Sequence, residues 1–374
     1  MKYKILTVVG TRPEIIRLSE IIKSFDKNFK HLLVHTNQNF DKNLKDVFFK
    51  ELSLKKPDYD LKVKEKTASK SIASIIYKIE DIIIKEKPDA FFILGDTNSC
   101  LSAIVARKYK IPIFHYEAGN RCFDQRVPEE TNRSVIDHMS DINLTYSDFA
   151  SKNLLNEGMP ADRIIKVGSP LKEVFLKNKQ KILKSSILKK YKLKKNNYVL
   201  VSYHREENVD DIKKLKIFVS TLENIHNSLK LPIIVSTHPR TRKKLNQLKL
   251  NIMNKILYAE PFSYFDYMKL QINSKIVISD SGSISEESSI LGFKAISLRD
   301  TLERQEAMEN SVVIMSTLQE KNIENALKIS LDNNYKSKIY KDYNESEVSS
   351  KITRIVTSYI EYVNREVWKK NIKY

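Results

Sequence analysis

The sequence predicts an α/β protein built from two parallel-sheet domains in series. Short apolar runs alternate with amphipathic segments of helical length up to about residue 170, and the same alternation restarts near residue 197. Such alternation is typical of parallel sheets that are covered by helices on both faces. The length of 374 residues fits two domains of ordinary size. Glycine is scarce, with 7 residues in the chain, and several of these directly follow a predicted strand.

The first half of the chain contains four predicted strands and three predicted helices. The strands are short and rich in β-branched or aromatic residues, at 4–9, 31–35, 90–94 and 111–116. The helices carry apolar residues at helical spacing, at 13–25, 73–85 and 99–108. On this pattern we place the first domain at residues 1–171.

The second half repeats the pattern after a Lys-rich linker region at 172–196. Predicted strands separated by helical segments lie at 198–202, 233–237, 256–258, 275–279 and 295–298. We therefore place the second domain at 197–345. In the last segment, 346–374, apolar side chains from Ile352 to Val367 fall on one face of a predicted helix. That face must be covered by another part of the protein.

Composition narrows the class of protein. No apolar run approaches the ~18 residues that a membrane span needs, and the first predicted strand begins so close to Met1 that no signal peptide is expected. The two cysteines, Cys100 and Cys122, exclude a disulfide scaffold and favour a reducing compartment. We therefore expect a soluble, cytoplasmic protein with no membrane partner.

The net charge is strongly positive, at +19 from 65 Lys and Arg against 46 Asp and Glu. Such a balance can indicate nucleic acid, anionic metabolites or lysines on solvated helix faces. The densest basic stretch, 177–195, lacks the interleaved aromatic residues of a base-stacking surface. We therefore expect solvated helices and an anionic small substrate, and no nucleic-acid partner.

Several familiar functional motifs are absent from the sequence. The chain has no G-x-G-x-x-G, no G-x-x-x-x-G-K-[ST] and no G-x-S-x-G. No spacing of cysteine and histidine fits a metal site, so none is expected. These absences argue against dinucleotide oxidoreductases, P-loop ATPases, serine hydrolases and zinc enzymes.

Ligands of open parallel sheets bind outside the carboxyl ends of the strands, and two such domains facing each other would form one cleft. After the first predicted strand, residues 10–14 (GTRPE) place Arg12 at a helix N-terminus, as an anion contact or as part of an ordinary capped helix start. After the strand at 90–94, Asp96 could cap the next helix. Because the three polar residues that follow could cap it as well, we expect Asp96 to point toward the ligand.

The segment 115–133 is the most unusual part of the chain, since it concentrates acidic and basic residues after an apolar strand. Its charged residues include Glu117, Asp124, Glu129, Glu130, Arg121, Arg126 and Arg133. Convergent carboxylates with balancing cations suit proton transfer at carbon. A structural ion-pair network is the alternative interpretation.

In the second half, three segments that follow predicted strands suit a phosphate. The runs 202–208, which contains His204, and 237–240 each combine histidine with arginine. The run 280–287 (DSGSISEE) is a turn of small residues that leads into a helix, where backbone N–H groups can bind phosphate. Glu287 in that helix could accept ribose hydroxyls, and Arg304 adds a cation.

Together these motifs resemble the non-hydrolysing UDP-N-acetylglucosamine 2-epimerase family, in order and through nearly the whole chain. Three runs are similar to one branch of that family, which converts UDP-2-acetamido-2,6-dideoxy-β-L-talose to UDP-N-acetyl-β-L-fucosamine for bacterial capsule and O-antigen. They are residues 8–17 (VVGTRPEIIR), 120–126 (NRCFDQR) and 280–289 (DSGSISEESS).

The resemblance implies a GT-B fold, in which two Rossmann-like domains are joined and the C-terminal helix crosses back onto the first. It implies a homodimer and a mechanism without cofactors. UDP leaves C1 together with loss of the C2 proton, which gives a 2-acetamidoglycal, and UDP then re-adds while the proton is delivered to the other face.

Position by position, the resemblance also implies roles for the candidate residues. Asp96, Glu117 and Glu129 match the acid–base carboxylates, and His204 matches the histidine on the diphosphate. The positions that match substrate-binding residues are Arg12, Arg17, Ser281, Gly282, Ser283, Glu287 and Arg304.

The chain departs from the UDP-N-acetylglucosamine enzymes in ways that favour the L-sugar branch. Arg17 stands where they have lysine, Ser283 replaces the second glycine of their Gly-Gly, and residues 303–306 read ERQE in place of ERPE. Their activator-site Q-H-R is QNF at 38–40, which argues against allosteric activation. The alternatives are a UDP-N-acetylglucosamine 2-epimerase giving UDP-N-acetylmannosamine and, more distantly, a GT-B glycosyltransferase.

Overall fold

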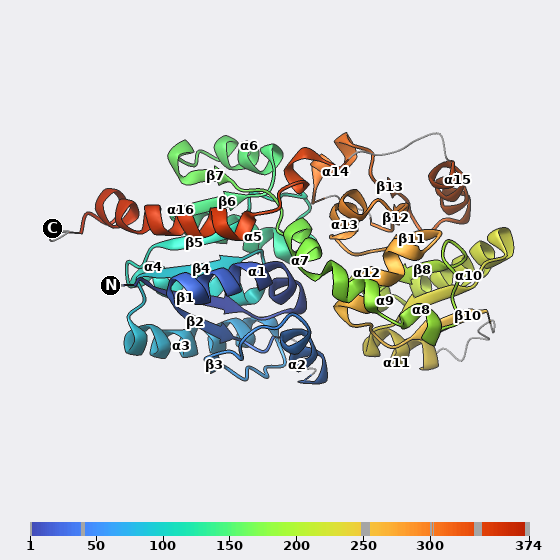
Figure 1. Ribbon diagram of the computed structural model, residues 1–374, viewed down its shortest axis with the longest axis horizontal. Helices are drawn as coiled ribbons and strands as arrows, with labels where there is room; N and C mark the ends of the chain where they lie inside the picture. The colour runs from blue at the N-terminus through green and yellow to red at the C-terminus, as the bar shows by residue number, and fades with distance from the viewer. Residues whose placement is uncertain are drawn as a thin grey trace. The chain divides into compact units, whose positions relative to one another are not determined.

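The computed structural model describes residues 2–38, 42–247, 255–299, 301, 303–332 and 339–370, with only the backbone described at 42–46, 206, 207 and 240. The chain divides into two compact units, each built on a parallel sheet with helices (Figure 1). Unit 1 consists of Met1–Leu176 and Lys341–Tyr374, and unit 2 is Lys177–Tyr340. The predicted class, α/β with two Rossmann-like parallel-sheet domains, is confirmed.

The sheet of unit 1 has seven strands in the order β3-β2-β1-β4-β5-β6-β7. Neighbouring strands run parallel, and the register of β1 pairs Leu6 with Leu32 of β2 and with Phe91 of β4. The strands are β1 (Lys4–Val9), β2 (Lys30–His35), β3 (Tyr59–Asp60), β4 (Ala90–Leu94), β5 (Ile113–Ala118), β6 (Ile142–Thr145) and β7 (Ile164–Lys166).

Helices connect these strands and bury apolar stripes against the sheet. The isoleucines of the predicted stripe at 73–85 do so, because Ile75, Ile79, Ile82 and Ile83 are buried in one cluster with residues of β1 and β4. The α-helices of this part of the chain are α1 (Arg12–Asn28), α2 (Lys42–Glu51), α3 (Ala68–Glu86), α4 (Ala103–Lys108), α5 (Pro128–Met139), α6 (Asp148–Asn156) and α7 (Leu171–Lys184).

The sheet of unit 2 has six strands in the order β10-β9-β8-β11-β12-β13. The central strand β8 is buried on both faces, because Val199 and Val201 belong to one apolar cluster while Tyr198 and Leu200 belong to another. The strands are β8 (Val199–Ser202), β9 (Ile233–Ser236), β10 (Ile256–Ala259), β11 (Ile276–Ser279), β12 (Ala295–Ser297) and β13 (Ile314–Met315). The helices are α8 (Ile187–Lys190), α9 (Glu206–Val209), α10 (Ile212–Leu229), α11 (Pro239–Gln247), α12 (Tyr264–Asn273), α13 (Ile284–Leu291), α14 (Gln305–Glu309) and α15 (Glu320–Leu331).

The C-terminal helix α16 (Val348–Tyr362) belongs to unit 1, where Figure 1 shows it in red among the blue and green elements. Its apolar face is buried, and Ile352, Val356 and Ile360 are fully inaccessible. The Thr353 and Ser24 hydroxyls lie 2.7 Å apart, which joins α16 to α1. The predicted return of the C-terminal helix onto the first domain is therefore confirmed.

Each sheet has a switch point, where the strand order reverses its direction relative to the chain. In unit 1 it lies between β1 and β4, and in unit 2 between β8 and β11. Ligands of such sheets bind at the carboxyl ends of the strands that flank the switch point. The residues that follow these strands are the turns at 10–14 and 95–99 in unit 1 and at 203–205 and 280–283 in unit 2.

Several elements differ from the sequence-based expectation. The predicted strand at 111–116 lies two residues later, so that Glu117 is inside β5 and not in the loop that follows it. The predicted helix at 99–108 begins as a 3₁₀ turn at Asn98–Ser102 and becomes α-helical as α4. The region 172–196, predicted as a linker, contains most of α7 and all of α8. The strands β3, β6, β7 and β13 were not expected, and two of them, β3 and β13, are only two residues long.

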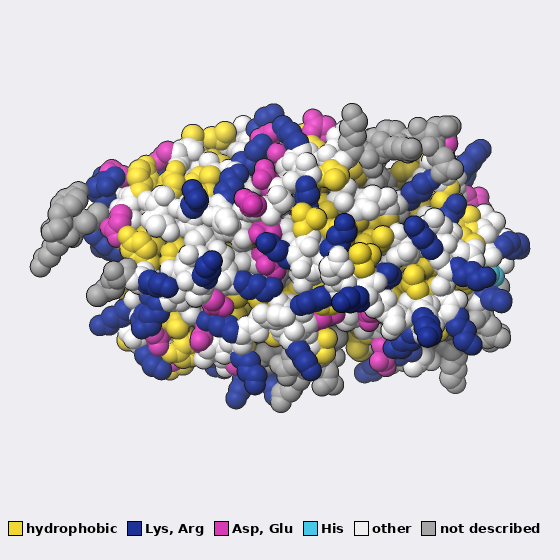
Figure 2. Space-filling model, viewed as in Figure 1, with side chains coloured by type: hydrophobic (Ala, Val, Ile, Leu, Met, Phe, Trp, Pro, Cys, Tyr) yellow, Lys and Arg dark blue, Asp and Glu magenta, His cyan; other side chains and the backbone are white. Residues whose placement is uncertain are grey.

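Basic side chains do not gather over a single element of the visible face. Figure 2 shows Lys and Arg distributed over that face, with acidic and apolar side chains between them. Lysines in the basic stretch 177–195 are exposed on α7, α8 and the loop that follows. Within the described ranges no helix is both long and apolar enough to cross a membrane.

Candidate active site

The two turns at the switch point of unit 1 are joined by the buried carboxylate of Glu14. Its Oε2 accepts hydrogen bonds from the backbone N–H groups of Gly10 and Thr11, at 2.9 and 2.6 Å. Its Oε1 accepts from the hydroxyl of Thr97, at 2.9 Å, in the turn that carries Asp96. Burial raises the pKa of this carboxyl although the hydrogen bonds oppose the shift. The T-x-x-E spacing at residues 11–14 is a capping-box signal that could have identified Glu14 from sequence.

The two arginines predicted in this unit lie in different surroundings. Arg12 is exposed at the first position of α1, and its guanidinium lies over the ring of Phe48. Arg17 is buried one turn further along the helix, with its Nε 3.8 Å from Oε2 of Glu117. Arg17 also donates through Nη1 to the hydroxyl of Tyr146, at 3.3 Å. The structure therefore brings Arg17 to a predicted carboxylate, Glu117.

Glu117 has an unusual backbone conformation for a glutamate. Its φ is +71°, in the left-handed region, at a point where the register of β5 against β6 shifts between Tyr116 and Ala118. A bulge of this kind redirects a side chain, and the strain it stores is often found at functional sites. The Glu117 carboxylate accepts hydrogen bonds from the Tyr146 hydroxyl at 3.1 Å and from the Asn120 amide at 3.4 Å. It is also close to the turn of Asp96, since its Oε2 lies 4.0 Å from the point where a Cβ on Gly95 would stand.

Asp96 is held by an arginine from α5. Its Oδ2 accepts from Nε of Arg133 at 2.7 Å, and Nη1 of Arg133 donates to Glu130 at the same distance. Glu130 in turn accepts from the backbone N–H groups of Cys122 and Phe123. Burial acts to raise the pKa of Glu130, but these hydrogen bonds outweigh it and hold the pKa below its ordinary range. Arg133 therefore orients the carboxylate of Asp96, and the role of Asp96 toward a ligand stays a prediction.

Glu129 lies in the first turn of α5, half-buried, directly before the Glu130 that anchors Arg133. A carboxylate there is favoured by the positive N-terminal end of the helix. Three segments of unit 1 thus each supply one predicted acid–base carboxylate. Asp96 follows β4, Glu117 lies near the end of β5, and Glu129 lies at the start of α5.

The alternative interpretation of 115–133 as an ion-pair network also holds for part of the segment. Arg121 is buried and binds Glu157 through two nitrogens, at 2.7 and 2.6 Å, and Asp137 at 2.7 Å. Asp137 further lies 2.8 Å from Nδ1 of His115. On the surface, Arg126 pairs with Asp124. Proton-transfer candidates and structural ion pairs are therefore interleaved in one segment, and residue type alone could not separate them.

In unit 2, a fully buried aspartate orients His204. Oδ1 of Asp280 lies 2.7 Å from Nδ1 of His204, while its Oδ2 accepts from the backbone N–H of Arg205 and from the amide of Asn208. A carboxylate only accepts, so the Nδ1 of His204 carries the hydrogen and Nε2 is the nitrogen that faces away from Asp280. Burial acts to raise the pKa of Asp280, but the charge and hydrogen bond of His204 outweigh it and lower the pKa. Asp280 belongs to the motif at 280–287, but its sequence position did not indicate this role because its partner lies 76 residues away.

The turn after β11 is organised by its own side chains. The hydroxyls of Ser281 and Ser283 lie 3.0 Å apart, and Ser283 donates to Oε1 of Glu287 at 2.8 Å. The other oxygen of Glu287 accepts from the amide of Gln271 at 2.6 Å. Gly282 lies between them, where a Cβ would stand 2.9 Å from atoms of the Arg299 and Glu303 side chains. The predicted nucleotide residues 281–283 and Glu287 are therefore in one local cluster.

Arg304 is a buried member of a neighbouring set of charges. Its Nη1 lies 3.6 Å from Oε2 of Glu286, which is fully buried in α13. Close by, Glu303 pairs with both Arg205 and Arg299. Arg304 and Glu303 thus join the loop after β12 to the turns after β8 and β11.

One predicted feature lies partly outside the described residues. In the run 38–40, Gln38 accepts from the Ser99 hydroxyl at 2.9 Å, whereas Asn39 and Phe40 are not described. The side chain of Arg240 is also outside the description. In the part of the chain that is described, no group of His, Cys, Asp and Glu is arranged to hold a metal ion.

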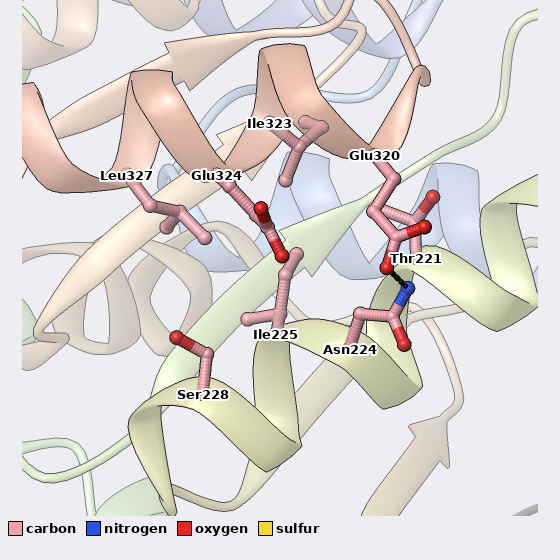
Figure 3. A pocket seen from close by; sticks show the side chains of 8 residues that line it. All are labelled: Thr221, Asn224, Ile225, Ser228, Glu320, Ile323, Glu324 and Leu327. Carbon is pink, nitrogen blue, oxygen red and sulfur yellow. Dashed lines mark hydrogen bonds between the residues drawn. The ribbon is translucent and has the colours of Figure 1, made fainter.

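A small surface pocket lies between α10 and α15 of unit 2 (Figure 3). At one end of it, the Asn224 amide donates a hydrogen bond to Glu320 at 2.6 Å (Figure 3). It is lined by Thr221, Asn224, Ile225, Ser228, Glu320, Ile323, Glu324 and Leu327. It contains none of the residues predicted for the active site.

Comparison with known proteins identifies the family. The family model for UDP-N-acetylglucosamine 2-epimerase matches residues 23–357. The solved UDP-N-acetylglucosamine 2-epimerase from Rickettsia bellii is 46% identical, with a TM-score of 0.92 over 99% of this chain and 100% of that one. The Methanocaldococcus jannaschii UDP-GlcNAc 2-epimerase, solved with UDP-GlcNAc and UDP, is 35% identical, with a TM-score of 0.89 over 95% and 99%.

A third relative shows that close sequences differ in the sugar they act on. It is the UDP-2,3-diacetamido-2,3-dideoxy-D-glucuronate 2-epimerase of Pseudomonas aeruginosa, which is 35% identical over 80% of this chain and 84% of its own. These matches agree with the two parallel-sheet units and with the residues found at both switch points. The chain belongs to the non-hydrolysing UDP-N-acetylglucosamine 2-epimerase family and is a 2-epimerase of UDP-sugars.

Proposed function

We propose that this enzyme converts UDP-2-acetamido-2,6-dideoxy-β-L-talose to UDP-N-acetyl-β-L-fucosamine in the cytoplasm, as a homodimer, for bacterial capsule or O-antigen. The observation that carries the proposal is that Arg17 and Asn120 both contact the carboxylate of Glu117. Arg17 replaces the lysine of the UDP-N-acetylglucosamine enzymes, and Asn120 opens the branch motif at 120–126. The departure at position 17 and the first residue of the branch motif therefore contact the same carboxylate.

The chemistry starts from a C2–H bond with no carbonyl beside C2, so direct exchange of this proton is slow. A base takes the C2 proton while the C1–O bond breaks, and UDP leaves with the bonding electrons. The 2-acetamidoglycal then accepts a proton at C2 on the opposite face while UDP re-adds to C1. No electrons are gained or lost overall, so no redox cofactor is needed.

We assign the proton transfers to the carboxylates of unit 1. Glu117 and Asp96 each contact an arginine, Arg17 and Arg133 respectively, which orients the carboxylate. Glu129 is the third member, at the N-terminus of α5. Arg12, exposed at the start of α1, is assigned to the anionic substrate.

We assign UDP to unit 2. His204, fixed by Asp280 through Nδ1, presents its Nε2 to the diphosphate and stabilises the charge that develops as UDP leaves. The turn 281–283 contributes hydroxyl and backbone N–H groups to the phosphates, and Glu287 accepts the ribose hydroxyls. Arg304, paired with Glu286, supports this site from the loop after β12.

The second candidate function is UDP-N-acetylglucosamine 2-epimerisation to UDP-N-acetylmannosamine. It is favoured by the names of the relatives from Rickettsia bellii and Methanocaldococcus jannaschii. A glycosyltransferase is no longer retained, because the family model and the relatives of 35–46% identity are 2-epimerases.

The experiment is NMR of the purified enzyme in D₂O with each UDP-sugar alone. The proposal predicts that deuterium enters C2 of the L-talo and L-fuco nucleotides during turnover, without a lag and without an added activator. Faster deuterium entry into UDP-N-acetylglucosamine would replace the proposal with the second candidate. Exchange with neither sugar would leave the substrate assignment without support.

A further inference from the structure

The carboxylate of Glu117 is surrounded by three polar side chains from three different elements. Nε of Arg17, on α1, lies 3.8 Å from Oε2. The hydroxyl of Tyr146, directly after β6, donates to the same oxygen at 3.1 Å. The amide of Asn120, after β5, donates to Oε1 at 3.4 Å. Both oxygens of Glu117 thus have a defined partner, and the plane of the carboxylate is set by these neighbours.

Tyr146 connects two of these three contacts. Its hydroxyl donates to Glu117 and accepts from Nη1 of Arg17 at 3.3 Å, and the guanidinium of Arg17 lies 5.6 Å from the centroid of its ring. The tyrosine is fully buried and its ring packs edge-on against Tyr116, so its hydroxyl has little freedom to move.

The arrangement explains why arginine, and not lysine, suits position 17. A planar guanidinium can lie over an aromatic ring and offer separate N–H groups to the phenol and to the carboxylate. A lysine ammonium is a point charge at the end of a flexible chain and does not hold two partners in fixed directions. Tyr146 therefore helps to hold the Arg17 guanidinium in place beside Glu117.

We propose that Tyr146 is a positioning residue that selects the sugar configuration by fixing the direction of the Glu117 carboxylate. This inference rests on the proposed function. The D- and L-sugars present their C2 hydrogens along different directions, and proton transfer needs a donor and acceptor within about 3 Å and in line. A carboxylate held by Tyr146, Arg17 and Asn120 can exchange a proton only with a C2–H bond that lies along one direction. Released from them, it rotates and serves the two configurations more equally.

The test is Tyr146→Phe, which keeps the ring and removes only the hydroxyl. With the L-talo nucleotide, kcat should fall by ~10–10² while KM stays within about twofold, because the residue acts on the base and not on the substrate. The ratio of kcat/KM for the L-talo nucleotide over UDP-N-acetylglucosamine should fall at least tenfold. Tyr116→Phe is the matched control, since it removes a buried hydroxyl that donates to the Gly168 carbonyl at 2.8 Å. This control should lower the melting temperature and leave the ratio unchanged.

A double-mutant cycle with Arg17→Lys supplies a second, independent readout. Because both residues act through Glu117, Arg17→Lys/Tyr146→Phe should be no more than about threefold slower than the slower single variant. If the two losses multiply, the inference is wrong. It is equally wrong if Tyr146→Phe and Tyr116→Phe change the ratio alike. If Tyr146→Phe fails to fold, Arg17→Lys alone must lower the ratio at constant KM, or the inference is withdrawn.

Failure of the inference is distinguishable from failure of the proposed function. If the wild-type enzyme exchanges no C2 deuterium into the L-sugar nucleotides, the substrate assignment is wrong and takes the inference with it. If the wild type exchanges deuterium rapidly but Tyr146→Phe keeps the wild-type ratio, only the role of Tyr146 is refuted.

Discussion

Replacing Asp280 by asparagine should separate the orientation of His204 from simple loss of a buried group. The carboxylate accepts from the His204 ring through Oδ1. Its Oδ2 accepts from three further donors, which are the backbone N–H groups of His204 and Arg205 and the amide of Asn208. An amide has one acceptor oxygen. If its NH₂ faced the Arg205 N–H, a buried donor would lose its partner at a cost of about 1–3 kcal/mol. The amide oxygen should therefore take the Oδ2 position, with its NH₂ toward His204.

That arrangement moves the ring hydrogen of His204 from Nδ1 to Nε2. Nδ1 of His204 must now accept, so the hydrogen resides on Nε2 and the ring is neutral where it meets the diphosphate. The substitution also removes the carboxylate that stabilises positive charge on the ring while negative charge develops on the leaving UDP. We expect UDP to bind about tenfold more weakly, which is ~1.4 kcal/mol, and turnover to fall by on the order of 10². The retained hydrogen bonds to position 280 lose their charge, so stability should fall by about 2–3 kcal/mol.

Calorimetry with UDP and nitrogen-15 NMR of the histidine rings measure these effects directly. Asp137→Asn is the matched control, because Asp137 is also a fully buried carboxylate 2.8 Å from a histidine Nδ1, that of His115. The control should lose stability to a similar extent while its UDP affinity stays within about twofold. Wild-type UDP affinity in Asp280→Asn, or an unchanged ring pattern for His204, would refute the reasoning.

Three further predictions concern the carboxylates, a glycine and acid stability. Amide substitution of each acid–base carboxylate should slow C2 deuterium exchange by ~10²–10⁴ while UDP affinity is retained. The variants are Asp96→Asn, Glu117→Gln and Glu129→Gln. Near-wild-type exchange in all three would remove these carboxylates from the mechanism. Gly119→Ala should cost more than about 4 kcal/mol or prevent folding, because its Cβ would stand 2.2 Å from the Ala150 carbonyl oxygen. Gly158→Ala has the same φ of +81° with nothing within 4 Å, so chemical denaturation should show a loss of only about 1–2 kcal/mol. Burial acts to raise the pKa of Asp137, but His115 and Arg121 outweigh it and hold the pKa below the ordinary 3.8. Its contribution is therefore complete above about pH 4 and is lost as the pH falls toward the folded-state pKa, so urea unfolding between pH 3 and 6 should show a flatter acid limb in Asp137→Asn.

The sequence predicted the fold well where a pattern is repeated over many residues. The apolar stripe of 73–85 and the single face of 346–368 each identified a helix, and the predicted strands at 4–9 and 90–94 match β1 and β4 residue for residue. The extra strands β3 and β13 are two residues long and carry no readable pattern. Long elements can therefore be predicted from their local hydrophobic pattern, whereas short edge strands depend on pairing with strands that are distant in sequence.

The candidate site was predicted in its residue types but not in its contacts. Arg17 and Glu117 were identified singly, and nothing in the sequence indicated that Tyr146 connects them. Glu117 was expected in a loop, yet it lies in a bulge of β5 with a left-handed backbone, which depends on the pairing of β5 with β6. Such contacts are set by tertiary packing and therefore cannot be derived from local patterns.

The return of α16 to unit 1 has a consequence for biosynthesis. Unit 2 is continuous in sequence, whereas unit 1 is interrupted between Leu176 and Lys341. While the ribosome makes the intervening residues, the surface of α1 that α16 later covers has no partner. At about 5–20 residues per second this interval lasts on the order of 10–30 s, and unit 2 can fold within it. Nascent chains should therefore be most vulnerable to aggregation and most dependent on chaperones after unit 1 has emerged and before Val348–Tyr362 is available.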